Sequence, residues 1–325
     1  MSGEFYLYVG TDLLVRALSE RYIAEEDRRV RTLLRMLSDA GATLVLAEPV
    51  LKEVSNHLKT TDIEYRSLFS KADREITLEV ARNASKILIR AYFYARLIPP
   101  QDSKPPSSWN DYLRQFCSPQ NVGKSRGTEE LKKYLLATFN LRFVSSEELL
   151  DLCSSEETVK TVNHVAEKLE PEKSNAELAR NDALMALSVY AHRRHAGETA
   201  TVSEFGYRTW WLTGETSILK YTRETVRQHG SRYMMRPEFL LNFISMAPSM
   251  VKVRTAYRRV FPSVLGVRLA SRVREDVFRG MMKKVQEAAD VEDGRMAAMI
   301  SEYSDRLKSD FDKRYVEQFD SGTNA

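Results

Sequence analysis

The sequence has little cysteine and no long apolar run, and each shortage excludes a class of protein. Only two of its 325 residues are cysteine, Cys117 and Cys153. They are too few for a disulfide framework and lack metal-ligand spacing, so we expect a reducing, cytoplasmic setting. The apolar stretch from Phe239 to Val251 is broken by Asn242 and Pro248, so we expect no membrane span. The first residues lack a basic lead and an apolar core, so we expect no signal peptide.

The sequence does contain enough apolar residues for a core, together with an uneven distribution of charge. Hydrophobic residues make up 43% of the chain and charged residues 29%, with a net charge of +4. The stretch from Val251 to Lys284 has ten Lys or Arg residues against two acids. Such a basic stretch is typical of surfaces that bind RNA or DNA. The alternatives are a solvated helix face or a docking surface for acidic segments of the same chain.

Short aromatic or β-branched segments alternate with helical patterns along the chain. Segments of this kind predict strands, and strands that alternate with helices predict an α/β fold. We therefore expect a mostly parallel sheet of about five strands with helices packed on both faces. The predicted strands are residues 4–9, 43–47, 140–144, 208–213 and 232–235.

The same patterns divide the chain into regions. We expect an α/β domain over residues 1–245, interrupted by a helical insertion over about 60–138. A basic helical region is expected over 246–320 and a disordered tail over 321–325. Ser145 with Glu148, and Ser174 with Glu177, have the spacing of capping boxes at two helix starts.

Four acids stand near predicted strand ends or helix starts. Asp12 and Glu215 follow strands, while Glu53 and Asp182 are expected in or near the first turns of helices. In an open α/β sheet, ligands bind at the carboxyl ends of the strands where the strand order reverses. Clustered carboxylates repel one another without a cation, and oxygen ligands of this kind select Mg²⁺ or Mn²⁺. Such ions activate water for phosphodiester cleavage. The alternative is that these residues are ordinary helix caps and surface acids.

Two further side chains are candidates for the same site. The Thr213 hydroxyl, at the end of a predicted strand, could orient water or a metal ligand. His57 lies four residues after Glu53 on the same predicted helix face, although a surface or core position is the simpler interpretation.

Several short motifs, taken in order, resemble the PIN domain, a family of metal-dependent nucleases that includes toxin ribonucleases. The resemblance covers roughly residues 4–58 and 140–245. Its motifs are Gly10–Leu18, Thr43–Leu58 with Glu53, Phe143–Glu148, Asn181–Leu187, Trp211–Glu215 and Arg236–Leu240. The chain departs from the family pattern at Gly10, where an Asp is usual, at Asp12, where Asn is usual, and at Glu215, where Asp is usual.

The resemblance implies a metal-dependent endoribonuclease. Asp12, Glu53, Asp182 and Glu215 would hold one or two Mg²⁺ or Mn²⁺ ions, supported by Thr213. It also implies a nucleic-acid substrate, with RNA favoured over DNA, a role as a toxin or defence effector, and a protein partner or homo-oligomer. The main alternative is a catalytically inactive PIN-like scaffold that binds RNA or protein, which Gly10 favours. A third is a helical interaction protein whose α/β part is structural.

Overall fold

The computed structural model describes residues 5–39, 41–71, 76–99, 104–173, 175–200, 207–215 and 217–237. The predicted regions 246–320 and 321–325, the basic stretch 251–284 and most of the 236–240 motif lie outside these residues. Within the described ranges, every helix is too short or too polar to cross a bilayer. Both cysteines are free and buried.

The fold is α/β, as the sequence predicted. Five parallel strands form one sheet in the order β3-β2-β1-β4-β5. The strands are β1 (Tyr6–Val9), β2 (Thr43–Ala47), β3 (Leu141–Val144), β4 (Thr209–Leu212) and β5 (Met234–Met235). The α-helices are α1 (Thr11–Ser19), α2 (Arg29–Asp39), α3 (Glu48–Glu64), α4 (Leu78–Asn83), α5 (Ile87–Leu97), α6 (Trp109–Arg114), α7 (Ser125–Phe139), α8 (Ser146–Leu152), α9 (Glu156–Leu169), α10 (Ala176–His195) and α11 (Arg223–His229).

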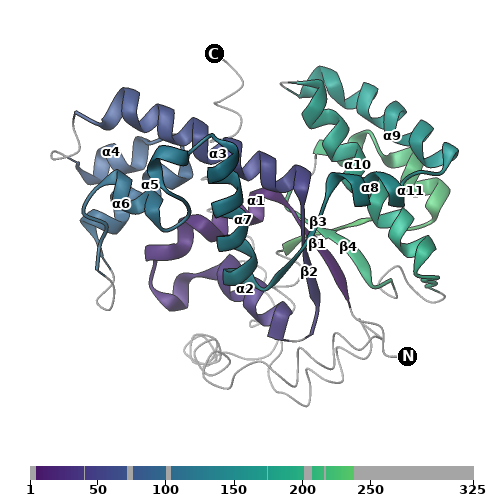
Figure 1. Ribbon diagram of the computed structural model, residues 1–325. Coiled ribbons are helices and arrows are strands. Elements are labelled where there is room, and N and C mark those ends of the chain that lie inside the picture. The colour runs from purple at the N-terminus through teal and green to yellow at the C-terminus, as the bar shows by residue number, and fades with distance from the viewer. Residues whose placement is uncertain are drawn as a thin grey trace, which may run out of the picture.

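The direction of the chain through the sheet explains why helices cover both faces. From β1 the chain steps outward to β2 and then β3, and afterwards it returns past β1 to β4 and β5. Parallel crossovers are right-handed, so reversing the direction moves the helices to the opposite face. Accordingly, α1 to α7 lie on one side of the sheet and α8 to α11 on the other (Figure 1). The strand order therefore reverses between β1 and β4.

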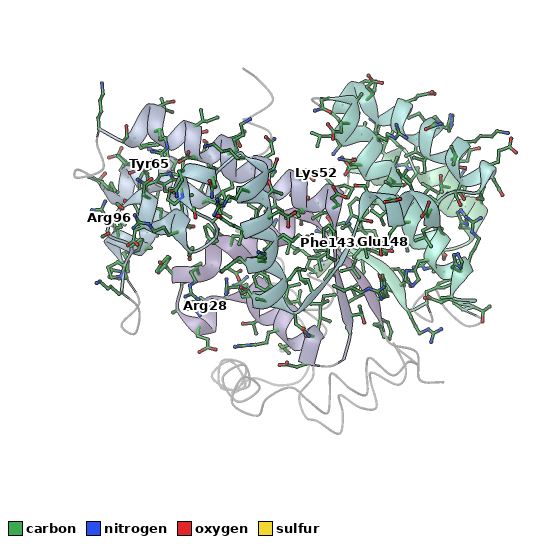
Figure 2. All side chains as sticks on the ribbon, viewed as in Figure 1. Arg28, Lys52, Tyr65, Arg96, Phe143 and Glu148 are labelled. Atoms are coloured by element: carbon green, nitrogen blue, oxygen red, sulfur yellow. The ribbon has the colours of Figure 1, made fainter. Side chains whose placement is uncertain are left out.

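The described residues between 60 and 138 are largely helical, and their aromatic side chains pack together as part of the one hydrophobic core. They include α4, α5, α6 and most of α7, and α5 packs against α1 and α3. The Trp109 ring stacks on Tyr65 with centroids 4.5 Å apart and on Tyr112 at 5.3 Å. Figure 2 marks Tyr65 and also Arg96, whose Nη1 donates to the Tyr92 hydroxyl at 3.0 Å.

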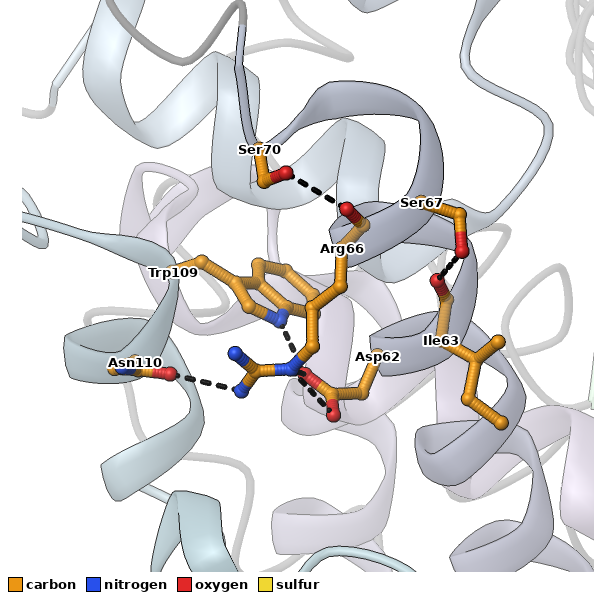
Figure 3. Close-up of polar contacts among 7 residues, drawn as sticks. All are labelled: Asp62, Ile63, Arg66, Ser67, Ser70, Trp109 and Asn110. Atoms are coloured by element: carbon orange, nitrogen blue, oxygen red, sulfur yellow. Dashed lines mark hydrogen bonds and ion pairs between the residues drawn. The ribbon is translucent and has the colours of Figure 1, made fainter.

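Asp62, near the end of α3, links that helix to these aromatic side chains. Asp62 Oδ1 accepts a hydrogen bond from Trp109 Nε1 at 2.8 Å, and Asp62 also accepts from Arg66 Nε at 2.9 Å (Figure 3). Arg66 in turn donates through Nη2 to Asn110 Oδ1 at 3.0 Å. The start of α6 is thus tied to the last turn of α3 and to the π-helical turn Tyr65–Phe69 that follows it. Helix α3 also carries Glu53.

Helix α10 is the central helix of the second layer. Its residues from Ala183 to Ala191 are all buried, because it packs against β4 on one side and against α8 and α9 on the others. The capping box at Ser145 and Glu148 is confirmed at the start of α8. The one predicted at Ser174 and Glu177 is wrong: Asn175 caps α10, and its Oδ1 accepts from the Leu178 N–H at 3.1 Å.

Arg193 fastens the end of α10 to the sheet. The residue is 4% exposed, and its Nε and Nη2 donate to the Thr209 carbonyl at 3.0 and 2.8 Å. Its Nη1 donates to the Arg232 carbonyl at 2.8 Å and to Ser231 Oγ at 3.2 Å. Since Thr209 begins β4 and Arg232 precedes β5, one guanidinium joins a helix to two strands.

We predict that Arg193→Met lowers the free energy of unfolding by about 3 kcal/mol, because buried carbonyls lose charged donors. Urea unfolding followed by circular dichroism measures this. The exposed neighbour Arg194 is the control, since Arg194→Met should cost less than about 1 kcal/mol. Equal losses in the two variants would contradict the anchoring role of Arg193.

Glu48 joins the start of α3 to the start of α8. Its Oε2 accepts from the Ser146 N–H at 2.8 Å, and its Oε1 pairs with Lys52 Nζ at 2.9 Å; Lys52 is marked in Figure 2. The Ser146 hydrogen bond, followed by Lys52, lowers the pKa of Glu48 to about 2. The charged carboxylate is therefore the form that the fold stabilises.

We predict a pH-dependent effect of Glu48→Gln. The folded pKa lies below the ordinary value of 4.5. The stabilisation is therefore complete above about pH 4.5 and is lost as the pH falls towards 2. At pH 7 the variant should be about 1.5 kcal/mol less stable than wild type, as is typical of a hydrogen bond to a charged group. Urea unfolding from pH 7 down to pH 3 checks this, with the exposed Glu147→Gln as control. A wild-type-to-variant gap that stays constant with pH would contradict the assignment.

Candidate metal centre

The candidate residues gather where the strand order reverses. Asp12 lies in the first turn of α1, directly after β1, and Thr213 and Glu215 follow β4. The register pairs Val9 with Leu212, and the Gly10 N–H donates to the Leu212 carbonyl at 2.8 Å. The ends of β1 and β4 are thus level, at the kind of edge where α/β sheets bind ligands.

Asp12 is held across this edge by the residues that follow β4. The Thr213 hydroxyl donates to Asp12 Oδ1 at 2.9 Å, and the Gly214 N–H donates to Oδ2 at 2.8 Å. Burial raises the pKa of Asp12, whereas the Gly214 hydrogen bond, the Arg16 charge and the Thr213 hydrogen bond each act to lower it. The carboxylate is therefore fixed in place and costly to ionise.

The absence of a side chain at Gly10 is what allows Asp12 to occupy this position. A Cβ placed on Gly10 would lie 2.7 Å from Asp12 Oδ1 and 2.8 Å from Thr213 Cβ. Real Cβ atoms essentially never come this close to another atom. The backbone of Gly10 is extended, at φ −75°, so space and not backbone conformation explains the glycine.

Glu53 approaches from α3 and is oriented by Thr11. The Thr11 hydroxyl donates to Glu53 Oε2 at 2.5 Å. Burial raises the pKa of Glu53, and the charges of Asp182 and Asp12 add to the rise, while the Thr11 hydrogen bond and Lys173 oppose it. Glu53 thus lies close enough to two of the other acids for their charges to act on it.

Asp182 approaches from the opposite layer, on α10, and is paired with a lysine. Lys173 Nζ lies 2.7 Å from Asp182 Oδ2, and the two side chains are 20% and 17% exposed. Burial raises the pKa of Asp182, Lys173 lowers it, and Glu215 raises it further. Burial alone would lower the pKa of Lys173, but the charges of Asp182, Glu215 and Glu53 raise it, so Lys173 is a stable cation.

Glu215 is the exposed member of the group. Its Oε1 accepts a hydrogen bond from the Ser217 N–H at 2.9 Å, and its N–H donates to the Thr213 hydroxyl at 3.1 Å. Its charge acts on both Asp182 and Lys173. Thr213 therefore contacts residues on both sides, since it donates to Asp12 and accepts from Glu215.

The structure thus brings the four predicted acids together as a chain of electrostatic neighbours, Asp12 to Glu53 to Asp182 to Glu215. Their local positions differ from expectation: α3 begins at Glu48 and α10 at Ala176, so Glu53 and Asp182 lie in second turns, not first turns. Across the described ranges, no three His, Cys, Asp or Glu side chains are arranged as a metal-ligand group.

Two residues of the site were not identified from the sequence. Thr11 stands beside Asp12 at the strand end, a position that could have suggested it. Lys173 precedes α10 and has no motif around it, so only the folded chain reveals its contact with Asp182. Burial, followed by the charge of Lys86, lowers the pKa of His57, and none of the four acids contributes to that shift.

Searches against family models, curated proteins and solved structures find no significant match to this chain. The resemblance to PIN domains therefore rests on the short motifs alone and stays a prediction.

We predict that Thr213→Val destabilises the fold by about 1.5 kcal/mol. Valine keeps the shape of the buried threonine but leaves Asp12 Oδ1 and the Glu215 N–H without their hydroxyl partner. Thr213→Ser keeps the hydroxyl and should cost less. Chemical denaturation of the two variants beside wild type tests this, and a valine variant as stable as the serine variant would exclude a role for the hydroxyl.

Proposed function

We propose that this protein is a PIN-like, divalent-metal-dependent endoribonuclease. The observation that carries the proposal is that each of the four carboxylates has another of them as an electrostatic neighbour, beside the edge where the strand order reverses. A five-stranded parallel sheet with helices on both faces is also what a PIN-like domain requires.

The chemistry of these residues fits Mg²⁺ or Mn²⁺. Asp12, Glu53, Asp182 and Glu215 offer only oxygen donors, which are the ligands that these hard cations prefer. Burial raises the pKa of Asp12, Glu53 and Asp182, so ionising these carboxyl groups costs free energy. A bound cation would lower that cost because it stabilises the ionised forms. When bound, such an ion supplies charge neutralisation at a phosphate and lowers the pKa of a water.

The residues of this chain would orient the ligands. Thr213 and Gly214 hold Asp12, and Thr11 holds Glu53, so two carboxylates from the same face are preorganised. Such donors to ligating carboxylates set the direction of the remaining lone pairs. Glu215 is exposed and can adjust to an ion or to substrate. Cleavage of this type would leave 3′-hydroxyl and 5′-phosphate ends.

Several parts of the proposal rest on the sequence alone. The basic stretch 251–284 would grip the phosphate backbone, which attracts Lys and Arg regardless of base sequence. RNA is favoured over DNA, and a toxin or defence role is proposed, as is a protein partner or a second copy of the chain. The cytoplasmic setting is proposed from the low cysteine content.

A second candidate is a catalytically inactive PIN-like scaffold that binds RNA or protein. Two observations favour it: position 10 has no acid, and Lys173 already neutralises Asp182. In addition, no three acidic or other ligating side chains within the described residues are placed as a metal-ligand group.

A cleavage assay separates the two candidates. We expect the full chain to cut single-stranded RNA in the presence of Mn²⁺ and to lose that activity when EDTA is added. Asp182→Asn should lower the rate at least about 100-fold, since even residues that only support metal ligands are worth 10- to 100-fold. The exposed Asp151→Asn on α8 is the matched control and should cut like wild type.

Parallel reactions on single-stranded DNA test the preference for RNA. Activity that is absent, or that is equal in wild type and Asp182→Asn, would overturn the nuclease proposal. If the inactive chain still retards RNA in a gel, the scaffold candidate holds.

A further inference from the structure

Lys173 is held at the site by its own segment. It follows the 3₁₀ turn Glu170–Glu172, and its N–H donates to the Glu170 carbonyl at 3.2 Å. The preceding residue, Glu172, pairs with Lys220 at 2.8 Å, which fastens the segment to the turn that follows β4. The backbone that carries Lys173 is therefore tied to both α10 and the β4 side of the site.

The ammonium group lies among the acids and not at their margin. Its Nζ contacts Asp182 Oδ2 at 2.7 Å, and the charges of Glu215 and Glu53 also act on it. Within the described part of the chain, the charge of Lys173 interacts with three of the four acids, while Arg16 acts on Asp12. A single positive charge stands where the nuclease proposal requires a divalent cation.

We propose that Lys173 is a displaceable counter-ion, which occupies Asp182 in the metal-free protein and must leave it before a divalent cation can bind there. The inference rests on the proposed function and adds a competitor for the metal to that site.

The physical argument is that both cations compete for the same carboxylate. A divalent ion contacts carboxylate oxygens at roughly 2.0–2.6 Å, so an ammonium at 2.7 Å from Asp182 Oδ2 would be its direct neighbour. Like charges that close repel strongly in a partly buried site. Lysine suits the role because its charge is compact and its stem flexible, so it can swing away without breaking a bidentate contact.

Competition of this kind keeps the acids together without metal and weakens the apparent metal affinity. When only the molecules with Lys173 displaced can bind metal, the measured dissociation constant is the intrinsic constant divided by the fraction of such molecules. Couplings between two ligands of one protein commonly amount to about fivefold or more. Removing the ammonium should therefore tighten metal binding even though no metal ligand has changed.

The test is Mn²⁺ binding to the full chain, followed by the electron paramagnetic resonance signal of free Mn²⁺. Lys173→Met, which keeps the length of the side chain but not its charge, should bind Mn²⁺ at least about fivefold more tightly than wild type. Lys173→Arg should bind no more tightly than wild type. The control is Lys168→Met on α9, which removes an exposed charge that pairs with Glu224 at 4.0 Å and should leave the affinity within about twofold of wild type.

Equal or weaker Mn²⁺ binding by Lys173→Met overturns the inference. A matching gain in Lys168→Met would show a general charge effect and overturns the inference as well. If wild type binds Mn²⁺ and cuts RNA while Lys173→Met binds no better, only the inference fails. If neither protein binds Mn²⁺ or cuts, the proposed function fails with it. If Lys173→Met does not fold, Lys173→Gln is measured in its place. If neither variant folds without metal, millimolar Mn²⁺ should restore the native circular dichroism spectrum. A lack of rescue counts against the proposal.

Discussion

Repulsion among carboxylates governs how the edge beyond β1 and β4 is built. A buried charge without a partner costs several kcal/mol, so each acid needs a donor of its own. The structure supplies them separately: Thr213 and Gly214 serve Asp12, Thr11 serves Glu53, and Lys173 serves Asp182. These partners come from three segments that are distant in the sequence. The site is therefore an outcome of the whole fold, and its geometry is only as firm as the packing that brings the segments together.

The reversal of strand order is what makes that meeting possible. Because the chain leaves β1 in one direction and returns to β4 on the other side, α3 and α10 lie on opposite faces of the sheet. Each helix then contributes one acid to the candidate site, Glu53 from one layer and Asp182 from the other. Arg193 matters to this arrangement although it lies far along α10, since it fixes the helix to the starts of β4 and β5. The orientation of Asp182 thus depends on a contact about three helical turns away.

Much of this could be read from the sequence, and the failures have physical causes. The apolar segment 43–47 is a strand with the predicted bounds, and the alternation of strands and helices gave the correct fold class. The acids were named because a charge beside a buried strand end stands out. The start of α10 was misplaced because several polar residues there can all cap a helix, and Asn175 does so. Lys173 was missed because its ion pair with Asp182, nine residues later, depends on the path of the turn that leads into α10. Hydrophobic periodicity in the sequence does not predict that path.

The glycine at position 10 and the position of the Asp12 side chain depend on each other. With a side chain at position 10, Asp12 could not fold back to the end of β4; with glycine there, its two oxygens reach Thr213 and Gly214. Under the proposed likeness to PIN domains, Asp12 from α1 would stand in for the acid that the family pattern places at position 10, and Asp12 is already hydrogen-bonded through both oxygens. In the proposed metal site, Asp12 would offer a cation only its remaining lone pairs, so capture of the cation would depend on Asp182. Lys173 contacts Asp182 Oδ2 at 2.7 Å. The two proposed functions, nuclease and silent scaffold, therefore differ in one physical respect: whether a divalent cation or the lysine binds Asp182 more favourably.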